Sequence, residues 1–166
     1  HVCNDDWNIK QDAGRTIGEA EKEIIPKFPN YEKQIKMYYS NHRLMIKKTF
    51  IDSIEALNQL KHYNYLCYVL SNWSAETFKG MKDDYLFLNQ FDGIIISGED
   101  SLIKPNSAIY QLAIKRFDLD PEITVFIDDK LENIQAAENN GFKTIHLTDP
   151  TKIKQEINFF LNNVLK

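Results

Sequence analysis

The amino-acid sequence predicts an α/β fold, in which a parallel Rossmann-like sheet carries a small helical domain. Apolar runs of strand length alternate with segments of helical periodicity, and such runs are typical of strands buried in a parallel sheet. Helical connections between the strands make the parallel arrangement the expected one. The four predicted strands cover residues 65–70, 93–97, 123–127 and 143–147.

Composition limits the class of protein. The chain has 166 residues, of which 43% are hydrophobic, and this is enough for a globular domain with a core. A net charge of −4 with scattered Lys and Arg argues against a nucleic-acid partner, and no apolar run has the length of a membrane span. Cys3 and Cys67 fit no metal-binding spacing, so we expect a reducing, cytoplasmic setting.

The N-terminal part differs from the rest of the chain. Residues 1–50 show helical patterns without a strand, so we predict a helical domain there and an α/β core at 51–166. One helix is expected at about 16–25, ended by Pro26, and a longer one after Asn30 as its N-cap. The first ten residues are polar and form no signal peptide. Because they also lack a starting Met, we expect the chain to begin inside a longer protein.

Capping and turn residues delimit the helices of the core. Asp52 or Ser53 is expected to cap the helix before the first strand, and Ser74 is expected to cap a short helix after it. Pro105 is expected at the first position of the helix that follows the second strand. Two further helices are predicted, one from Leu131 to a C-cap at Asn140–Gly141 and one from Pro150, with an apolar face that runs to Val164.

Polar residues follow three of the predicted strands. Ser71 and Asn72 come after the first strand, Lys104 after the second, and Asp128 with Asp129 after the third. Ligands of open α/β sheets bind beyond the carboxyl ends of the strands, so we expect these side chains to converge. Adjacent carboxylates are unfavourable to bury without a cation, and Mg²⁺ prefers oxygen ligands. A hydroxyl, an ammonium and a metal together suit a phosphoryl group.

Each of these residues also has an ordinary structural interpretation. The two carboxylates can cap the following helix, and that stretch alone leaves both interpretations open. Ser71 and Asn72 are common turn residues, and a lysine before a proline, as at Lys104, is commonly a solvated loop residue. His146, in the last predicted strand, is more often a core or edge residue than a catalytic base. The order of the three polar groups along the chain favours the site.

This order of residues resembles the haloacid dehalogenase (HAD) superfamily. The matching segments are residues 70–72, 104–105 and 126–129, followed by Asn133 and Gly141. The sequence is most similar to the small phosphatases of that superfamily that carry a helical cap. The resemblance implies that Ser71 binds the phosphoryl group, that Lys104 orients the nucleophile and offsets charge, and that Asp128 and Asp129 hold Mg²⁺.

The resemblance extends more loosely over residues 1–50, which would form the cap. There, Trp7, Asn8, Gln11 and Arg15 are candidates for substrate binding, together with Asn72 from the core. Cap packing and solvated polar surface are the alternative interpretation of each cap residue, and the commoner one.

One motif of the family is missing from the sequence. In the family an apolar strand that ends in a nucleophilic Asp precedes the cap, and it lies between the Ser71 strand and the Asp128 strand. Unpaired strand edges inside a sheet are unfavourable. We therefore expect a segment encoded before His1, or another chain, to complete the sheet and supply the nucleophile. Residues 1–166 alone are expected to be inactive.

These observations predict a Mg²⁺-dependent phosphatase that acts on a small phosphorylated metabolite through an aspartyl phosphate. Two alternatives stay open. A 2-haloacid dehalogenase shares the Ser-Asn and Lys positions, but it displaces halide at carbon and has no need of Mg²⁺. A non-catalytic scaffold or binding module with the same fold would lack the nucleophile altogether. The adjacent acids Asp128 and Asp129 favour the phosphatase.

Overall fold

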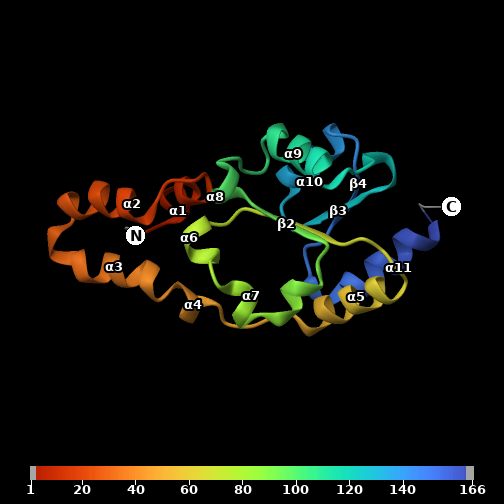
Figure 1. The fold of residues 1–166 in the computed structure, drawn as a ribbon, viewed down its shortest axis with the longest axis horizontal. Coiled ribbons are helices and arrows are strands. Elements are labelled where there is room, and N and C mark those ends of the chain that lie inside the picture. Colours follow the sequence, from red (N-terminus) through yellow and green to blue (C-terminus); the bar gives the residue numbers. More distant parts are fainter. Residues whose placement is uncertain (1–2, 164–166) are drawn as a thin grey trace.

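Parallel strands with helices on both sides form the larger part of the molecule, and a group of helices extends from one end (Figure 1). A computed structural model describes residues 3–163. The predicted α/β fold is confirmed. Within the described residues, no helix is long and apolar enough to cross a membrane.

The helices of the N-terminal part are α1 (Asp5–Asp12), α2 (Ile17–Ile24), α3 (Glu32–Ser40) and α4 (His42–Met45). The strands are β1 (Tyr68–Ser71), β2 (Gly93–Ile96), β3 (Val125–Asp128) and β4 (Lys143–His146). The other helices are α5 (Ile51–His62), α6 (Ala75–Phe78), α7 (Met81–Asp84), α8 (Ser97–Asp100), α9 (Ser107–Phe117), α10 (Leu131–Asn139) and α11 (Ile153–Asn163). Short 3-10 helices cover Ile25–Lys27, Pro29–Tyr31, Leu86–Gln90, Pro121–Ile123 and Pro150–Lys152.

The four strands form two separate parallel pairs. β1 pairs with β2, with Ser71 opposite Ile96, and β3 pairs with β4, with Asp128 opposite His146. In the part of the chain that the structure describes, β1 and β3 do not pair with each other. Each pair therefore keeps one strand edge that is not bonded to the other pair.

A shared apolar core joins the two strand pairs on one face. Ile109 and Tyr110 of α9 are fully buried there against Ile95 of β2. Phe126 of β3 packs against the same cluster, and its ring meets the Tyr110 ring edge-on at 5.4 Å between centroids. Side chains from both pairs thus contact one helix, so packing rather than hydrogen bonding holds the two sheets together on this face.

Helices α5 and α11 cover the opposite face (Figure 1). Ala56 of α5 and Ile157 of α11 are buried there, and Val125 and Ile127 of β3 pack against this cluster. Successive side chains of a strand point to opposite faces, which is why Phe126 lies on the α9 face and its two neighbours do not. Val164, predicted to lie on the apolar face of the last helix, is outside the described residues.

The N-terminal helices enclose a small core of their own. Trp7, Ala20, Ile24 and Ile35 are buried in it together with Tyr39. The Tyr39 hydroxyl accepts hydrogen bonds from Trp7 Nε1 at 2.8 Å and from the Gln11 amide. Burial raises the pKa of Tyr39 to about 12, so the hydroxyl keeps its proton. The domain boundary between residues 50 and 51 stays a prediction, although α5 begins at Ile51.

The first strand is shorter than predicted. It begins at Tyr68 rather than at residue 65, and Tyr65 and Leu66 are 43% and 69% exposed. Tyr68 is paired with Gly93, the first residue of β2, so the residues before Tyr68 have no neighbouring strand. The apolar composition of residues 65–67 predicted a strand, but in the described part of the chain these residues have no neighbouring strand with which to pair. Similarly, Ile123 belongs to a 3-10 helix and is 70% exposed.

Several helix boundaries differ from the predicted ones. The long helix expected after Asn30 is divided into α3 and α4 at Asn41, whose amide nitrogen donates to the Met37 carbonyl at 3.0 Å. The helix expected from Ser74 through Met81 ends at Phe78, and Gly80 follows with a φ of +80°. One side-chain hydrogen bond, from Asn41 at the end of α3, and one left-handed glycine, Gly80, interrupt helical patterns that sequence periodicity alone leaves continuous.

The N-caps of two core helices also differ from the prediction. α5 follows Phe50, which makes no side-chain cap, whereas Asp52 lies in its first turn. α9 begins at Ser107 and not at Pro105, because the Asn106 side chain caps it by accepting from the Ala108 N–H at 2.9 Å.

Replacing Tyr39 by Phe tests the core of the N-terminal helices. The change leaves the buried Trp7 and Gln11 donors without their acceptor, so we expect a loss of about 2 kcal/mol in the free energy of unfolding, measured by urea denaturation. Tyr38→Phe is the matched control, because its hydroxyl accepts one partly buried bond from Asn8. Equal losses for the two variants would contradict the central role of Tyr39.

Candidate active site

The loop after β1 is held against the end of β2. Trp73 donates its backbone N–H to Ser97 Oγ at 2.9 Å, and the Gly98 N–H donates to the Trp73 carbonyl at 3.1 Å. A Cβ at Gly98 would lie only 2.5 Å from the Ala75 nitrogen and 2.8 Å from the Trp73 oxygen. A glycine is therefore required for this close approach, and the half-buried Ser71 lies at the start of a fixed loop.

Asn72 connects this loop to the segment that carries Lys104. Its Nδ2 donates to the Lys104 carbonyl at 2.9 Å, and its Oδ1 accepts from the Lys104 N–H at 2.9 Å. One side chain thereby pairs with both backbone groups of one residue. The peptide bond between Lys104 and Pro105 is cis.

A buried ion pair joins Lys104 to the end of β3. Lys104 Nζ lies 2.6 Å from Asp128 Oδ2, and the two side chains are only 10% and 6% exposed. The ammonium also lies 5.5 Å from the centre of the Phe126 ring, within the range of a cation–π contact. The ends of β1 and β3 are thus linked through Lys104, although their backbones are not hydrogen bonded to each other.

The other carboxylate oxygen of Asp128 is held by two donors. Asp128 Oδ1 accepts from the Lys130 N–H and from Asn133 Nδ2, each at 2.9 Å. Burial by itself would raise the pKa of Asp128. The charge and hydrogen bond of Lys104, with these two donors, outweigh burial and hold the pKa below its ordinary value. Asp128 is therefore ionised at neutral pH.

Asn133 belongs to this site, although sequence reasoning gave it no role of its own. The residue is 3% exposed, and its backbone carbonyl accepts from the Tyr110 hydroxyl at 2.9 Å. Burial, followed by the nearby charge of Asp128, raises the pKa of Tyr110, so the hydroxyl remains a donor. Asn133 Oδ1 is buried and has no hydrogen-bond partner among the described residues. The sequence feature that could have identified Asn133 is its position, five residues after Asp128 and on the first turn of α10.

Asp129 differs from Asp128 in its surroundings. Its residue is exposed, and its backbone carbonyl lies 3.1 Å from His146 Nε2. Its carboxylate is thus open to solvent next to a carboxylate that is already paired. The structure links Asn72 to the Lys104 backbone and the Lys104 side chain to Asp128, and Ser71 and Asp129 are the chain neighbours of Asn72 and Asp128.

The four candidates of the cap make contacts within the cap. Trp7 and Gln11 are 6% and 2% exposed and bond to Tyr39. The Arg15 guanidinium lies 4.0 Å from the centre of the Trp7 ring and donates to Gln11 Oε1 at 2.8 Å. Asn8 donates to the Tyr38 hydroxyl. Cap packing explains each of these contacts, and a role of the four residues in substrate binding stays a prediction.

Asp12 is a cap residue that the sequence analysis did not single out for the site. Burial raises the pKa of its carboxyl, and the Lys130 ammonium and the Ser74 N–H oppose this shift. Ser74 lies three residues after Ser71, and Lys130 follows Asp129. A carboxyl from α1 therefore faces the loops that follow β1 and β3.

Comparison with known proteins places the chain in a family. Residues 8–147 match the haloacid dehalogenase-like hydrolase family. The chain belongs to this family. The HAD membership predicted from the order of Ser71, Lys104 and Asp128 is thus confirmed.

Curated relatives of this HAD chain include a phosphatase and two dehalogenases. The sesquiterpene phosphatase astK of Aspergillus oryzae is 34% identical over 93 residues, which cover 56% of this chain and 47% of that protein. The (S)-2-haloacid dehalogenase 1 of Pseudomonas sp. is 28% identical over 108 residues, which cover 65% of this chain and 47% of that protein. The chain spans about half the length, or less, of the curated relatives it matches.

Solved structures support the same HAD fold. A predicted HAD-like family hydrolase from Porphyromonas gingivalis has a TM-score of 0.77 at 23% identity, over 93% of this chain and 78% of that one. A HAD family enzyme from Bacteroides thetaiotaomicron, solved as a magnesium complex, has a TM-score of 0.70 at 23% identity, over 85% of this chain and 74% of that one. At these identities the likeness shows the fold alone.

The residues of the site fit a magnesium ion in part. Within residues 3–163, no cluster of three His, Cys, Asp or Glu side chains is arranged to hold a metal. Asp128 and the open Asp129 supply oxygen donors, and the unpartnered Oδ1 of Asn133 lies in the residue that bonds to Asp128. Mg²⁺ is commonly bound through one or two carboxylates, with water and phosphate as its other ligands, so the donor set is compatible with it.

Replacing Lys104 by Met tests the ion pair. The change leaves the Asp128 carboxylate buried without a cation, and we expect a loss of about 3 kcal/mol in the free energy of unfolding at neutral pH, measured by urea denaturation. The loss should shrink as pH falls through the pKa of Asp128, because a protonated carboxyl needs no cation. Lys36→Met, which removes an exposed pair with Glu32, should cause no measurable change. A loss at Lys104 that is independent of pH would contradict this account.

Proposed function

We propose that the complete protein is a Mg²⁺-dependent phosphatase that hydrolyses a small phosphorylated metabolite through an aspartyl phosphate. The observation that supports this most is the Lys104–Asp128 ion pair, at 2.6 Å, with an open second carboxylate at Asp129. An ammonium and an acid pair at one sheet edge suit the charge of a phosphoryl group. The sesquiterpene phosphatase relative is consistent with this chemistry. With Cys3 and Cys67 as free thiols, we place the reaction in the cytoplasm.

The proposed roles follow from the positions of the residues. A carboxylate oxygen attacks phosphorus, and the bond from phosphorus to the ester oxygen breaks with its electron pair on that oxygen, which takes a proton from solvent water and leaves as the alcohol. Water then hydrolyses the acyl phosphate to inorganic phosphate and restores the carboxylate. The Ser71 hydroxyl donates to a phosphoryl oxygen, and the Lys104 ammonium offsets the charge that develops. Asp128 and Asp129 would hold Mg²⁺, which supplies positive charge at the phosphoryl oxygens.

The attacking carboxylate is proposed to lie on a further strand between β1 and β3. The two strand pairs are not bonded to each other, although Asn72, Lys104 and Asp128 link their ends. One additional parallel strand would satisfy both open edges. A segment of the same protein or another chain can supply it.

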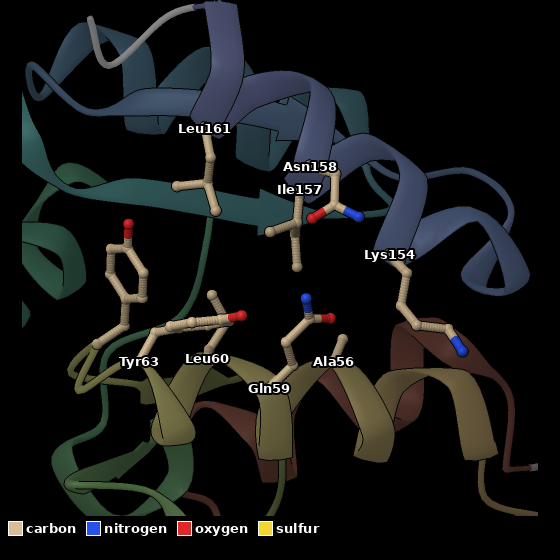
Figure 2. A pocket seen from close by; sticks show the side chains of 9 residues that line it. Ala56, Gln59, Leu60, Tyr63, Lys154, Ile157, Asn158 and Leu161 are labelled. Carbon is tan, nitrogen blue, oxygen red and sulfur yellow. The ribbon is translucent and has the colours of Figure 1, made fainter.

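A groove between α5 and α11 supports this placement. It has a volume of about 410 Å³. Figure 2 shows Ala56 and Leu60 of α5 directed toward Ile157 and Leu161 of α11 across the groove, and Tyr63, the residue after α5, also lines it. Tyr65, which also lines it, leads into β1, and α11 packs on β3. Apolar side chains on one face of an inserted strand would fill this space.

The decisive experiment compares the full-length protein with residues 1–166 alone. We expect hydrolysis of p-nitrophenyl phosphate that EDTA abolishes and Mg²⁺ restores, and no hydrolysis by residues 1–166 alone. Asp129→Asn should lower kcat by about 100-fold, whereas Asp84→Asn, which removes an exposed carboxylate that pairs with Arg43, should not change it.

The same assays separate the alternatives. The dehalogenase relative favours a 2-haloacid dehalogenase as the second candidate, and release of chloride from (S)-2-chloropropionate without a metal would establish it in place of the phosphatase. Activity in neither assay, with a folded protein, would favour the non-catalytic scaffold.

A further inference from the structure

Asn72 contacts the backbone of Lys104 at two points. Its amide nitrogen bonds to the Lys104 carbonyl and its amide oxygen to the Lys104 N–H, each at 2.9 Å. Two opposed hydrogen bonds fix the rotation of the bound peptide groups as well as their distance, as in strand pairing. β1 ends before this point, at Ser71, so the side chain of Asn72 replaces a strand partner for Lys104.

The side chain of Lys104 depends on this backbone position. Lysine has many rotamers, so fixing its side chain in one place is unfavourable in conformational entropy. Its ammonium is nevertheless 2.6 Å from Asp128 Oδ2 and is held in a side chain that is 10% exposed. A shift of the Lys104 backbone would change the place that its ammonium can reach.

Asn72 is itself held from its C-terminal side. The next residue, Trp73, bonds through its N–H to Ser97 Oγ and through its carbonyl to the Gly98 N–H. The loop cannot move toward or away from β2 without breaking these bonds. Because this loop is fixed, the hydrogen bonds of Asn72 also fix the position of the Lys104 backbone.

We propose that Asn72 is a positioning residue that sets the Lys104 ammonium against Asp128, and that it is not a group that binds the phosphoryl substrate. The inference rests on the proposed phosphatase function for its kinetic part only. The amide oxygen and one amide N–H of Asn72 are already engaged by Lys104, which separates this role from the substrate-binding role predicted from sequence.

The test compares Asn72→Ala and Asn72→Asp with Asn140→Ala. Asn72→Asp keeps the size and the acceptor but places a carboxylate oxygen against the Lys104 carbonyl. Asn140 is a matched control, because both ends of its carboxamide are also bonded, but to partners other than Lys104. Its Oδ1 accepts from Ser107 Oγ and Gln111 Nε2, and its Nδ2 donates to the Ala136 carbonyl. Folding of each variant is checked by circular dichroism, and Asn72→Asp carries the test if Asn72→Ala does not fold.

The first measurement is the rate of reductive methylation of Lys104 in the full-length protein, with the extent of methylation read by mass spectrometry. We expect the rate to rise on the order of ten-fold in both Asn72 variants, because the ammonium leaves its protected place. Asn140→Ala should leave the rate unchanged. An unchanged rate in the Asn72 variants would overturn the proposal.

The second measurement is hydrolysis of p-nitrophenyl phosphate, with inorganic phosphate as inhibitor. We expect kcat to fall by about ten-fold or more, with KM and the inhibition constant of phosphate within about two-fold of the wild-type values. A large rise in either constant would show that Asn72 binds the phosphoryl group, and would overturn the proposal. If the wild-type protein shows no phosphatase activity while methylation responds as expected, the proposed function fails and the positioning role stands.

Discussion

The ion pair between Lys104 and Asp128 is the interaction on which the site depends. Removing two charges from water is unfavourable, and their attraction compensates only when the geometry is good and further hydrogen bonds are present. Both conditions hold here. Asn72 fixes the backbone of the lysine, and Asn133 with the Lys130 N–H binds the second oxygen of the aspartate. Two carboxamides thus make a buried pair tolerable at the edge of the strands.

The same pair explains how a divided sheet keeps its strand ends together. β1 and β3 belong to different strand pairs, and on the α9 face they share only an apolar core. Apolar packing is non-directional, so it holds the two pairs together without fixing how their ends align. The contacts from Asn72 through Lys104 to Asp128 are directional, and they fix that alignment.

The sequence allowed the fold to be predicted because its strongest signals are periodic or short-range. Apolar runs located all four strands, and Gly141 marked the end of α10. The extent of β1 was not predictable in the same way, because strand pairing at Tyr68 depends on where β2 begins. The convergence of Lys104 and Asp128 followed from the rule that parallel strand ends share an edge. The Asn72 contact did not follow, because no local pattern shows which backbone groups lack a partner.

The charges of the site explain why a further cation belongs to the proposed chemistry. Lys104 is already paired with Asp128 at 2.6 Å, and Asp129 adds a second negative charge beside it. Lys130 is exposed, and the carboxyl of Asp12 faces it from the cap. A phosphoryl dianion at this edge of the strands would meet the carboxylates of Asp128 and Asp129, and an ammonium, that of Lys104, which is already paired with Asp128. The Lys104 ammonium can interact with a phosphoryl oxygen only when another cation offsets the negative charge of Asp128. The carboxylate oxygens of Asp128 and Asp129 are suited to a hard divalent cation. The acid pair and the lysine are therefore compatible with phosphoryl chemistry together with such a cation, and poorly suited to it without one.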